Sequence, residues 1–335
     1  MRIDAYTHFI PEKFFNKIVE SGHADIGKRV REIPSIHDLD ARKKVVDQFK
    51  DYAQILSYPM PPIEVLAKGE QVNEYCKLIN DGFVDICRND PDRFPGWVAE
   101  APIGAPDAGA RECERAIKAG ALGVQVHTNI AGKPLDEPEF EPFFARMAQL
   151  GKPVWVHPTR TAKTPDYATE DKSLYEIWWT FGWSYETAAA MARLVFSGIM
   201  DKYPNLKIIT HHFGGIVPML EGRIGPGWDQ IGARTSDADY QALLKSLKKR
   251  PLDYFKQDFY ADTAVFTSDA ATELGMKFYP LEKIVFASDC PFDPEKGTMY
   301  IRETLRIIDA LDLTKEQRHA VYQGNLERIT GKRFV

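Results

Sequence analysis

The chain has 335 residues, of which 44% are hydrophobic, so it can form one large α/β domain or two smaller ones. Its formal net charge of -5 argues against a general nucleic-acid-binding protein, although a local basic pocket for an acidic substrate stays compatible with that charge. No stretch reaches the roughly 18 uninterrupted apolar residues that a membrane span needs. Neither a nucleic acid nor a membrane is therefore expected as a partner.

The amino-terminal residues MRIDAYTHFIPEKFF contain no basic segment followed by a long apolar one, so we expect a cytoplasmic location. The four cysteines form no CxxC pair, and a chain of this length does not depend on disulfides to fold. We therefore expect reduced thiols.

Eight short apolar runs rich in β-forming residues follow one another along the chain and predict strands. They cover residues 3–8, 52–58, 94–102, 122–128, 153–158, 207–212, 257–263 and 284–289. Segments with apolar residues at helical spacing lie between them, at residues 64–90, 107–120, 139–151 and 184–204. Repeated strand-plus-helix units of this number predict an α/β protein with a closed (β/α)8 TIM barrel.

An open, doubly wound sheet is the competing architecture. No GxGxxG follows the first run, and polar residues end the first, fifth, sixth and eighth runs, which a barrel brings together and an open sheet does not. We expect a single barrel domain over residues 1–335. Residues 12–45 contain no clean amphipathic helix, and we predict that they form a lid or a small insertion after the first strand.

Four of the apolar runs end in His8, His157, His212 and Asp289. Histidines and an aspartate delivered by separate strands are what a divalent-metal site at the mouth of a parallel barrel needs. Any one of them alone would more often be a hydrogen-bonded polar cap on the core, but the four together indicate a functional site. Tyr6 lies two residues before His8, where such a site would usually contain another histidine.

A long loop at residues 159–183 follows the fifth run and contains Trp178, Trp179 and Trp183. These tryptophans can cover a pocket or fill a subunit interface, and taken alone they indicate packing more strongly than substrate contact. Trp179 is the one that we assign to substrate binding.

Several motifs, in order and nearly end to end, resemble the second amidohydrolase family. They are IDAYTHFIPEKF, GKPVWVHP, YPNLKIITHHFGGIVPMLEGRI, FYADT, IVFASDCPFD and VYQGNLERI. The resemblance is to the branch that contains the aminocarboxymuconate semialdehyde, γ-resorcylate and 5-carboxyvanillate decarboxylases. Each match is modest, but their order and spacing together are specific.

The resemblance implies that His8, His157 and Asp289 bind a divalent metal, most often zinc and sometimes manganese or magnesium. Relatives carry histidine or glutamate at the position of Tyr6. A tyrosine is a poor substitute, because its phenol ionises near pH 10 unless a metal lowers that value strongly. Three protein ligands, a water and a substrate oxygen still suffice for a catalytic metal. We therefore predict that Tyr6 lies in or next to the coordination sphere.

The resemblance also implies a catalytic histidine in the segment HHFGG. Matching its glycines assigns that role, as a base or an orienter of metal-bound water, to His212, with His211 pointing to the opposite side of the strand end. Arg42 and Arg223 match arginines that hold the substrate carboxylate in the family, the second from a neighbouring subunit. Without the resemblance each would be an ordinary helix or surface residue. Because guanidinium groups suit carboxylates, we expect a small carboxylated substrate and at least a homodimer.

The sequence thus predicts a metal-dependent, non-oxidative decarboxylase of an aromatic or muconate-type acid. Asp289, or a water activated by His212, would protonate the carbon that bears the carboxyl group. Two alternatives stay open. The same residues would serve a hydrolase or hydratase of a lactone, an amide or an unsaturated diacid, and a metal-free, non-catalytic homologue would result if Tyr6 disables the metal site.

Overall fold

The main strands of the protein run parallel to one another around a ring. The computed structural model describes residues 1–20, 28 and 30–334. The strands of the ring are β1 (Arg2–His8), β2 (Tyr52–Ser57), β3 (Gly96–Trp97), β4 (Ala99–Glu100), β5 (Val124–His127), β8 (Val154–His157), β9 (Ile208–Thr210), β10 (Phe259–Asp262) and β11 (Ile284–Val285). Two further short strands, β6 (Asn129–Ile130) and β7 (Lys133–Pro134), pair with each other in an antiparallel ribbon.

Backbone hydrogen bonds join the first strand of the ring to the last. Two sheets have the orders β1-β2-β3 and β11-β10-β9-β8-β5-β4, and all their strand pairs are parallel. Only Val98 separates β3 from β4, which makes them two halves of one strand. Beyond β11, the amide of Ala5 donates to the carbonyl of Phe286 at 2.8 Å, and the amide of His8 donates to the carbonyl of Cys290 at 2.8 Å. The predicted (β/α)8 barrel is confirmed, and each of its eight strands overlaps one of the predicted runs.

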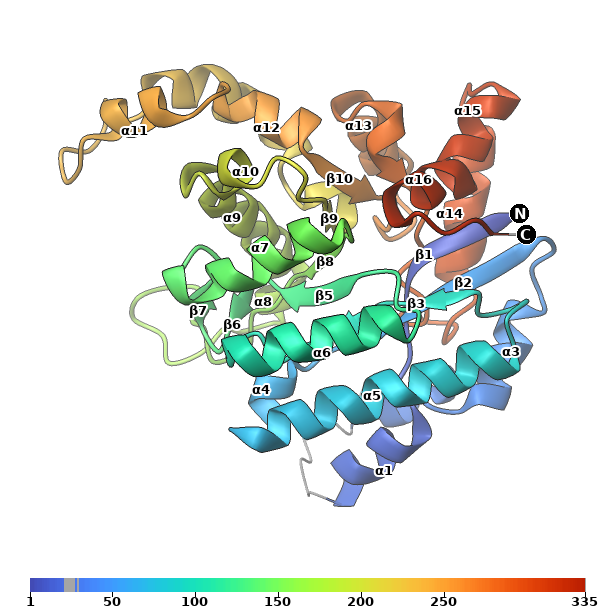
Figure 1. The fold of residues 1–335 in the computed structure, drawn as a ribbon. Coiled ribbons are helices and arrows are strands. Elements are labelled where there is room, and N and C mark those ends of the chain that lie inside the picture. Colours follow the sequence, from blue (N-terminus) through green and yellow to red (C-terminus); the bar gives the residue numbers. More distant parts are fainter. Residues whose placement is uncertain (21–27, 29, 335) are drawn as a thin grey trace.

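Helices surround the ring, and α5, α6 and α7 lie alongside one another over one side of it (Figure 1). The long helix α5 shows why they pack there, because its buried residues recur at helical spacing and form one apolar face. The helices are α1 (Glu12–Glu20), α3 (Leu39–Val46), α4 (Ile63–Leu66), α5 (Glu70–Asn89), α6 (Pro106–Lys118), α7 (Glu141–Leu150), α8 (Ile177–Thr180), α9 (Gly182–Phe196), α10 (Ile199–Lys202), α11 (Tyr240–Ser246), α12 (Pro251–Gln257), α13 (Asp269–Phe278), α14 (Met299–Ala310), α15 (Lys315–His319) and α16 (Asn325–Thr330).

Alternate residues of a strand face two different cores. In β8, Val154 and Val156 pack in the larger core between the strands and the helices, whereas Trp155 packs inside the barrel. Because side chains alternate along a strand, the last residue of β8, His157, faces the same way as Trp155. The carboxyl ends of the strands therefore deliver inward-facing side chains to one mouth of the barrel.

A bulge in β1 changes which of its side chains face inward. The pairing of β1 with β2 shifts between Asp4 and Thr7, and Ala5 and Tyr6 both pack in the barrel interior. An extra residue in a strand reverses the alternation that follows it. Tyr6 and His8 consequently point into the barrel together.

The segment predicted to be a lid or insertion contains α1, a short 3₁₀ turn at Pro34–Ile36 and α3. Helix α1 packs against α5, and residues 21–27 and 29 of the segment lie outside the described residues. The two termini lie close together, and α11 projects from the body of the protein (Figure 1). Among the helices that the structure describes, none has the length and apolar character required to cross a membrane.

Candidate metal centre

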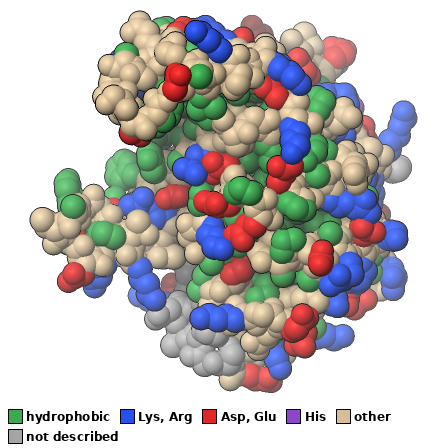
Figure 2. Space-filling model, turned by 60° about the vertical axis from the view of Figure 1, so that its left-hand side comes forward, with side chains coloured by type: hydrophobic (Ala, Val, Ile, Leu, Met, Phe, Trp, Pro, Cys, Tyr) green, Lys and Arg blue, Asp and Glu red, His purple; other side chains and the backbone are tan. Residues whose placement is uncertain are grey.

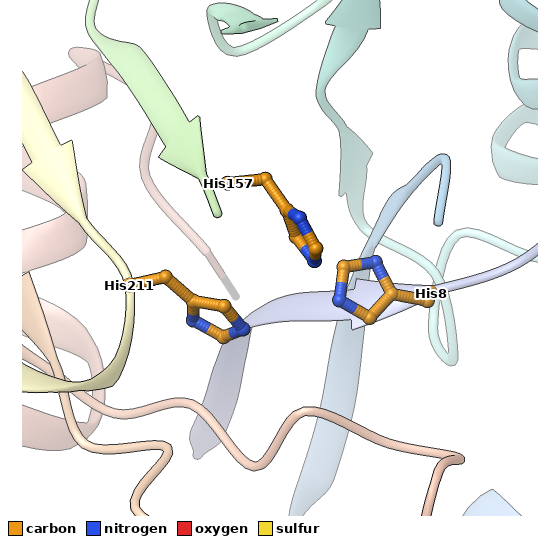
Figure 3. A group of neighbouring side chains, drawn as sticks. All are labelled: His8, His157 and His211. Carbon is orange, nitrogen blue, oxygen red and sulfur yellow. The ribbon is translucent and has the colours of Figure 1, made fainter. Parts of the chain in front are cut away.

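Three histidines and one aspartate meet at the mouth of the barrel. His8 and His157 end β1 and β8, His211 follows β9 directly, and Asp289 lies in the segment after β11. All four side chains are buried. Figure 3 shows the rings of the three histidines turned toward one another from separate strands. One ring nitrogen of each histidine lies within 4.8 Å of those of the other two.

Protein partners occupy the outer nitrogen of two of these rings. His157 Nδ1 donates to the carbonyl of Pro158 at 2.7 Å. His8 Nδ1 lies 3.0 Å from the hydroxyl oxygen of Ser57, whose own hydrogen is donated to the carbonyl of Thr7 at 3.0 Å. Both Nδ1 atoms therefore carry the hydrogen, which leaves a lone pair on each Nε2, facing inward. Partners of this kind orient histidines that bind metals.

The position of His8 is a direct test of whether a cation fits. Its Nε2 is buried and has no hydrogen-bond partner among the described residues, although Asp289 Oδ1 lies only 2.9 Å away. Burial lowers the pKa of His8, and burial together with the charge of His8 lowers the pKa of His157 further. Unprotonated nitrogens facing a carboxylate are the donor set of a divalent metal site. The residues present therefore fit a divalent metal ion.

The charge of Asp289 is maintained by its neighbours. Burial alone would raise the pKa of this carboxyl group, but its contacts with His211 and His8 outweigh burial and hold the pKa well below its ordinary value. Asp289 is therefore ionised and available to a cation at any neutral pH.

The structure corrects the predicted direction of His211. This side chain points into the site, with Nε2 at 3.2 Å from Asp289 Oδ1 and Nδ1 at 2.6 Å from Asp262 Oδ2. Burial lowers its pKa, but the charge of Asp262 and the hydrogen bonds to both carboxylates raise it to about 9. Of the site histidines, His211 is therefore the one whose ring is protonated on both nitrogens, and so positively charged, at neutral pH.

His212 also lies at the site, stacked on His211 with ring centroids 3.6 Å apart. Its Nδ1 donates to the carbonyl of Ala264. Burial and the charge of His211 lower the pKa of His212 to about 4, so its ring is neutral. One of its ring nitrogens also belongs to a second group that could hold a metal, with His211 and Asp289.

The hydroxyl of Tyr6 is bonded to a protein group and does not point toward the histidines as a metal ligand would. It donates to Gln125 Oε1 at 2.6 Å, and Gln125 Nε2 in turn donates to Glu100 Oε1 at 2.7 Å. Burial, then the charge of Glu100, raise the pKa of Tyr6 well above its ordinary value. The neutral phenol lies beside the rings of His8 and His211, so the ligand role predicted for Tyr6 is not supported by its position.

We expect Tyr6→Phe to keep the metal content of the protein within about twofold, because the hydroxyl is bonded to Gln125 rather than turned toward the histidines. The variant should unfold with a free energy lowered by about 1 kcal/mol, the usual value of one hydrogen bond. Elemental analysis and thermal unfolding measure the two effects. Tyr52→Phe is a matched control, since that hydroxyl donates to Asp4 at 2.6 Å. Loss of metal from Tyr6→Phe but not from the control would show that Tyr6 is a ligand.

Arg42 was predicted to bind a substrate carboxylate, but the nitrogens of its guanidinium group are bonded to protein groups. Its side chain is completely buried. Nε donates to the carbonyl of Ser35 at 2.7 Å, and Nη1 donates to Gln54 Oε1 at 3.1 Å and to Cys290 Sγ at 2.9 Å. Nη2 donates to the carbonyl of His8. The predicted clamp is therefore a structural arginine, which fixes the ends of β1 and of the segment after β11.

The other two residues predicted to bind substrate lie on the surface. Arg223 begins a short π-helical turn at Arg223–Gly227, is exposed, and forms no ion pair with any residue in the described part of the chain. Trp179 is 36% exposed and donates from Nε1 to Glu176 at 2.9 Å. Trp183, rather than Trp179, contacts the site, with its ring centroid 5.7 Å from that of His157.

Asp262 is a site residue for which the sequence predicted no role. It ends β10 and binds the ring of His211, and its Oδ1 accepts from the amides of His212 at 3.0 Å and Ala264 at 3.1 Å. The motif FYADT contains this aspartate and was the available signal. Asp262 fixes both histidines of the HHFGG segment.

A parallel barrel with buried histidines and a carboxylate at the carboxyl ends of its strands defines a class of metal-dependent enzymes. The profile of the amidohydrolase family matches residues 3–331. The protein belongs to the amidohydrolase family, which confirms the resemblance drawn from its motifs.

Relatives and a solved structure place it near decarboxylases. The chain is 30% identical over 272 residues to γ-resorcylate decarboxylase of Polaromonas sp. strain JS666, covering 76% of this chain and 77% of that one. It is 26% identical over 310 residues to 2-amino-3-carboxymuconate-6-semialdehyde decarboxylase of Dictyostelium discoideum, covering 87% and 82%. It also superimposes on the crystal structure of a dihydroxybenzoic acid decarboxylase from Polaromonas sp. JS666 with bound manganese and the inhibitor 2-nitroresorcinol. The TM-score is 0.79 at 25% identity, over 98% and 96% of the two chains.

Proposed function

We propose that the protein is a metal-dependent, non-oxidative decarboxylase of a small aromatic carboxylic acid. The observation that carries this proposal is that a possible cation site and a protonated histidine, His211, lie at the same mouth of the barrel. Ring nitrogens of His8, His157 and His211 lie within 4.8 Å of one another, Asp289 Oδ1 lies 2.9 Å from His8 Nε2, and the ring of His211 lies between the carboxylates of Asp262 and Asp289. The decarboxylase relatives support the same reaction.

Each residue has a distinct part in this proposal. His8, His157 and Asp289 would hold the metal, whose positive charge polarises a substrate oxygen. Asp262 keeps the ring of His211 in one orientation through its bond to Nδ1. His212, neutral and stacked on His211, is available to accept a proton or to orient a water.

The proton that His211 Nε2 shares with Asp289 is the one required by the reaction. Its transfer to the carbon that bears the carboxylate forms a C–H bond. The C–C bond to the carboxylate then breaks, its electron pair returns to the ring, and carbon dioxide leaves. His211 regains a proton from solvent, so that one carboxylate and one proton yield the ring product and carbon dioxide.

Aromatic side chains around the site suit a planar ring. Phe292 packs against His8 with ring centroids 5.5 Å apart, and Phe266 packs against His212 at 4.7 Å. Together with Trp183 beside His157, they supply three apolar surfaces at this mouth. Stacked and edge-to-face contacts of this kind favour an aromatic ligand over an extended chain.

The metal and the substrate can be identified in one experiment. The metal-stripped protein is reloaded with zinc, manganese or magnesium and incubated with hydroxybenzoates and with muconate semialdehydes, while carbon dioxide release is measured. We expect release from a hydroxybenzoate with at least one metal and none after chelation, and we propose zinc as the native metal. Substrate loss without carbon dioxide would indicate a hydratase or hydrolase. A protein that retains no metal would indicate a non-catalytic homologue.

We also infer that the protein acts as a homodimer. Large apolar side chains are exposed on and near the tryptophan-containing loop and on the turn before Arg223, namely Tyr167, Tyr175, Phe181, Tyr185 and Met219. Figure 2 shows hydrophobic side chains at the surface between charged ones on one face of the molecule. The exposed Arg223 lies four residues after Met219 and has no ion-pair partner in the described chain, which suits a subunit interface. Sedimentation equilibrium tests this inference, and a monomer at micromolar concentration would contradict it. The cytoplasmic location stays a prediction.

A further inference from the structure

His127 is a buried histidine that no part of the metal centre uses. It ends β5, and 3% of its surface is exposed. Its Nε2 has no hydrogen-bond partner in the part of the chain that the structure describes. Buried polar atoms nearly always have a partner, so one without any at the mouth of a barrel marks a place where a bound molecule can supply it.

The strand register directs His127 toward the site. His127 pairs with His157 across β5 and β8, as Gln125 pairs with Trp155 two residues earlier. Because paired residues of parallel strands point to the same face, His127 faces the barrel mouth with His157. Their ring centroids lie 5.6 Å apart, so His127 stands one ring away from the metal centre.

His127 differs from the metal-site histidines in how its ring is bonded. His8, His157 and His211 each have Nδ1 bound to a protein group, which fixes where their hydrogens lie. Neither nitrogen of His127 has such a partner within the described residues. Its ring can therefore present a donor or an acceptor at Nε2, and a hydroxyl group can complete either arrangement because it both donates and accepts.

We propose that His127 is a substrate-binding residue that recognises a hydroxyl group on the aromatic ring. This inference rests on the proposed function, since it takes the substrate to be a hydroxylated aromatic acid. His127 flanks the metal centre beside His157, with 5.6 Å between the two ring centroids. A hydroxyl group on the ring of a ligand bound at this mouth can therefore supply the partner that His127 Nε2 lacks.

Two non-reacting ligands test the proposal separately from turnover. 2-Nitroresorcinol carries two hydroxyl groups beside its nitro group, and nitrobenzene lacks both, while neither can release carbon dioxide. Their affinities for the metal-loaded protein are measured by calorimetry for the wild type, His127→Leu and His127→Gln. His319→Gln, which changes an exposed histidine at the end of α15, is the control.

We expect His127→Leu to weaken 2-nitroresorcinol binding about tenfold, the effect of one lost hydrogen bond, and to leave nitrobenzene binding unchanged. His127→Gln should keep the hydroxyl preference within about threefold, and every variant should keep its metal. Equal weakening of both ligands, no weakening, or a wild type without preference for 2-nitroresorcinol would overturn the proposal. Normal discrimination without carbon dioxide release from any hydroxybenzoate would refute the decarboxylase function and leave the role of His127 intact.

Discussion

Asp289→Asn is expected to lower carbon dioxide release at least about a thousandfold, because one side chain serves both the cation and the proton. Asp289 Oδ1 lies 2.9 Å from His8 Nε2 and 3.2 Å from His211 Nε2. An amide has the same size but no negative charge, so it binds a divalent metal more weakly and no longer stabilises the protonated form of His211. Turnover and metal per chain are both measured, and both should fall.

Asp293→Asn is the matched control for this substitution. Asp293 is buried in the same segment and accepts from the amide of Glu295 at 2.8 Å, without a contact to the histidines among the described residues. We expect its turnover to stay within about tenfold of the wild type, since it loses only part of its charge-assisted hydrogen bonds from the amides of Glu295 and Tyr300. If Asp289→Asn and Asp293→Asn had the same turnover, the role proposed for Asp289 would be refuted.

His211→Asn is expected to reduce turnover about a hundredfold to ten thousandfold, the usual contribution of a general acid. Asparagine can still donate to Asp262 from the position of Nδ1, but it has no group in place of Nε2. If His211 supplies the proton, the metal content should stay within about twofold while turnover falls. Metal analysis thus distinguishes the two possible roles of His211. If His211 is a fourth metal ligand, His211→Asn should lose metal as well as turnover.

His212→Asn, compared with His211→Asn, tests which of the two adjacent histidines has the catalytic role. This variant keeps a donor for the carbonyl of Ala264, and we expect it to lose about tenfold in turnover, as for a residue that orients a water. The opposite order of effects, with His212→Asn inactive and His211→Asn nearly normal, would return the catalytic role to His212.

The sequence was sufficient for the barrel and for three of the converging residues. Apolar runs rich in β-forming residues predicted every strand of the barrel, and the polar residues at their ends included His8, His157 and Asp289. These predictions needed only strand alternation and the fact that parallel strands end at one mouth. Strand alternation is a local property and the common mouth of parallel strands is a topological one, so both can be inferred from the sequence.

The error over His211 has a local physical cause. Alternation was extended through residues 211 and 212, but β9 ends at Thr210 and His212 adopts a positive φ of 57°. A left-handed backbone turns the chain abruptly, so the two rings stack at the same site instead of facing opposite sides. No strand rule applies beyond the last paired residue.

The roles of Arg42 and Tyr6 depended on contacts between distant segments. Arg42 lies 34 residues from His8 and 248 from Cys290, both of which it contacts, and Tyr6 lies 119 residues from Gln125. Nothing near either residue in the sequence shows that these partners occupy its polar atoms. Such pairings follow from packing the whole chain, which is why the side chains were assigned to a substrate and to a metal.

The barrel closes between β1 and the segment after β11, where His8 donates its amide to Cys290. The side chains of His8 and Asp289 stand on the two sides of this seam, and Arg42 lies behind it. An ion bound by both would act as a cross-link between the beginning and the end of the polypeptide. Metal binding would then stabilise the closed barrel as well as enable catalysis, so loss of the ion would lower both stability and activity.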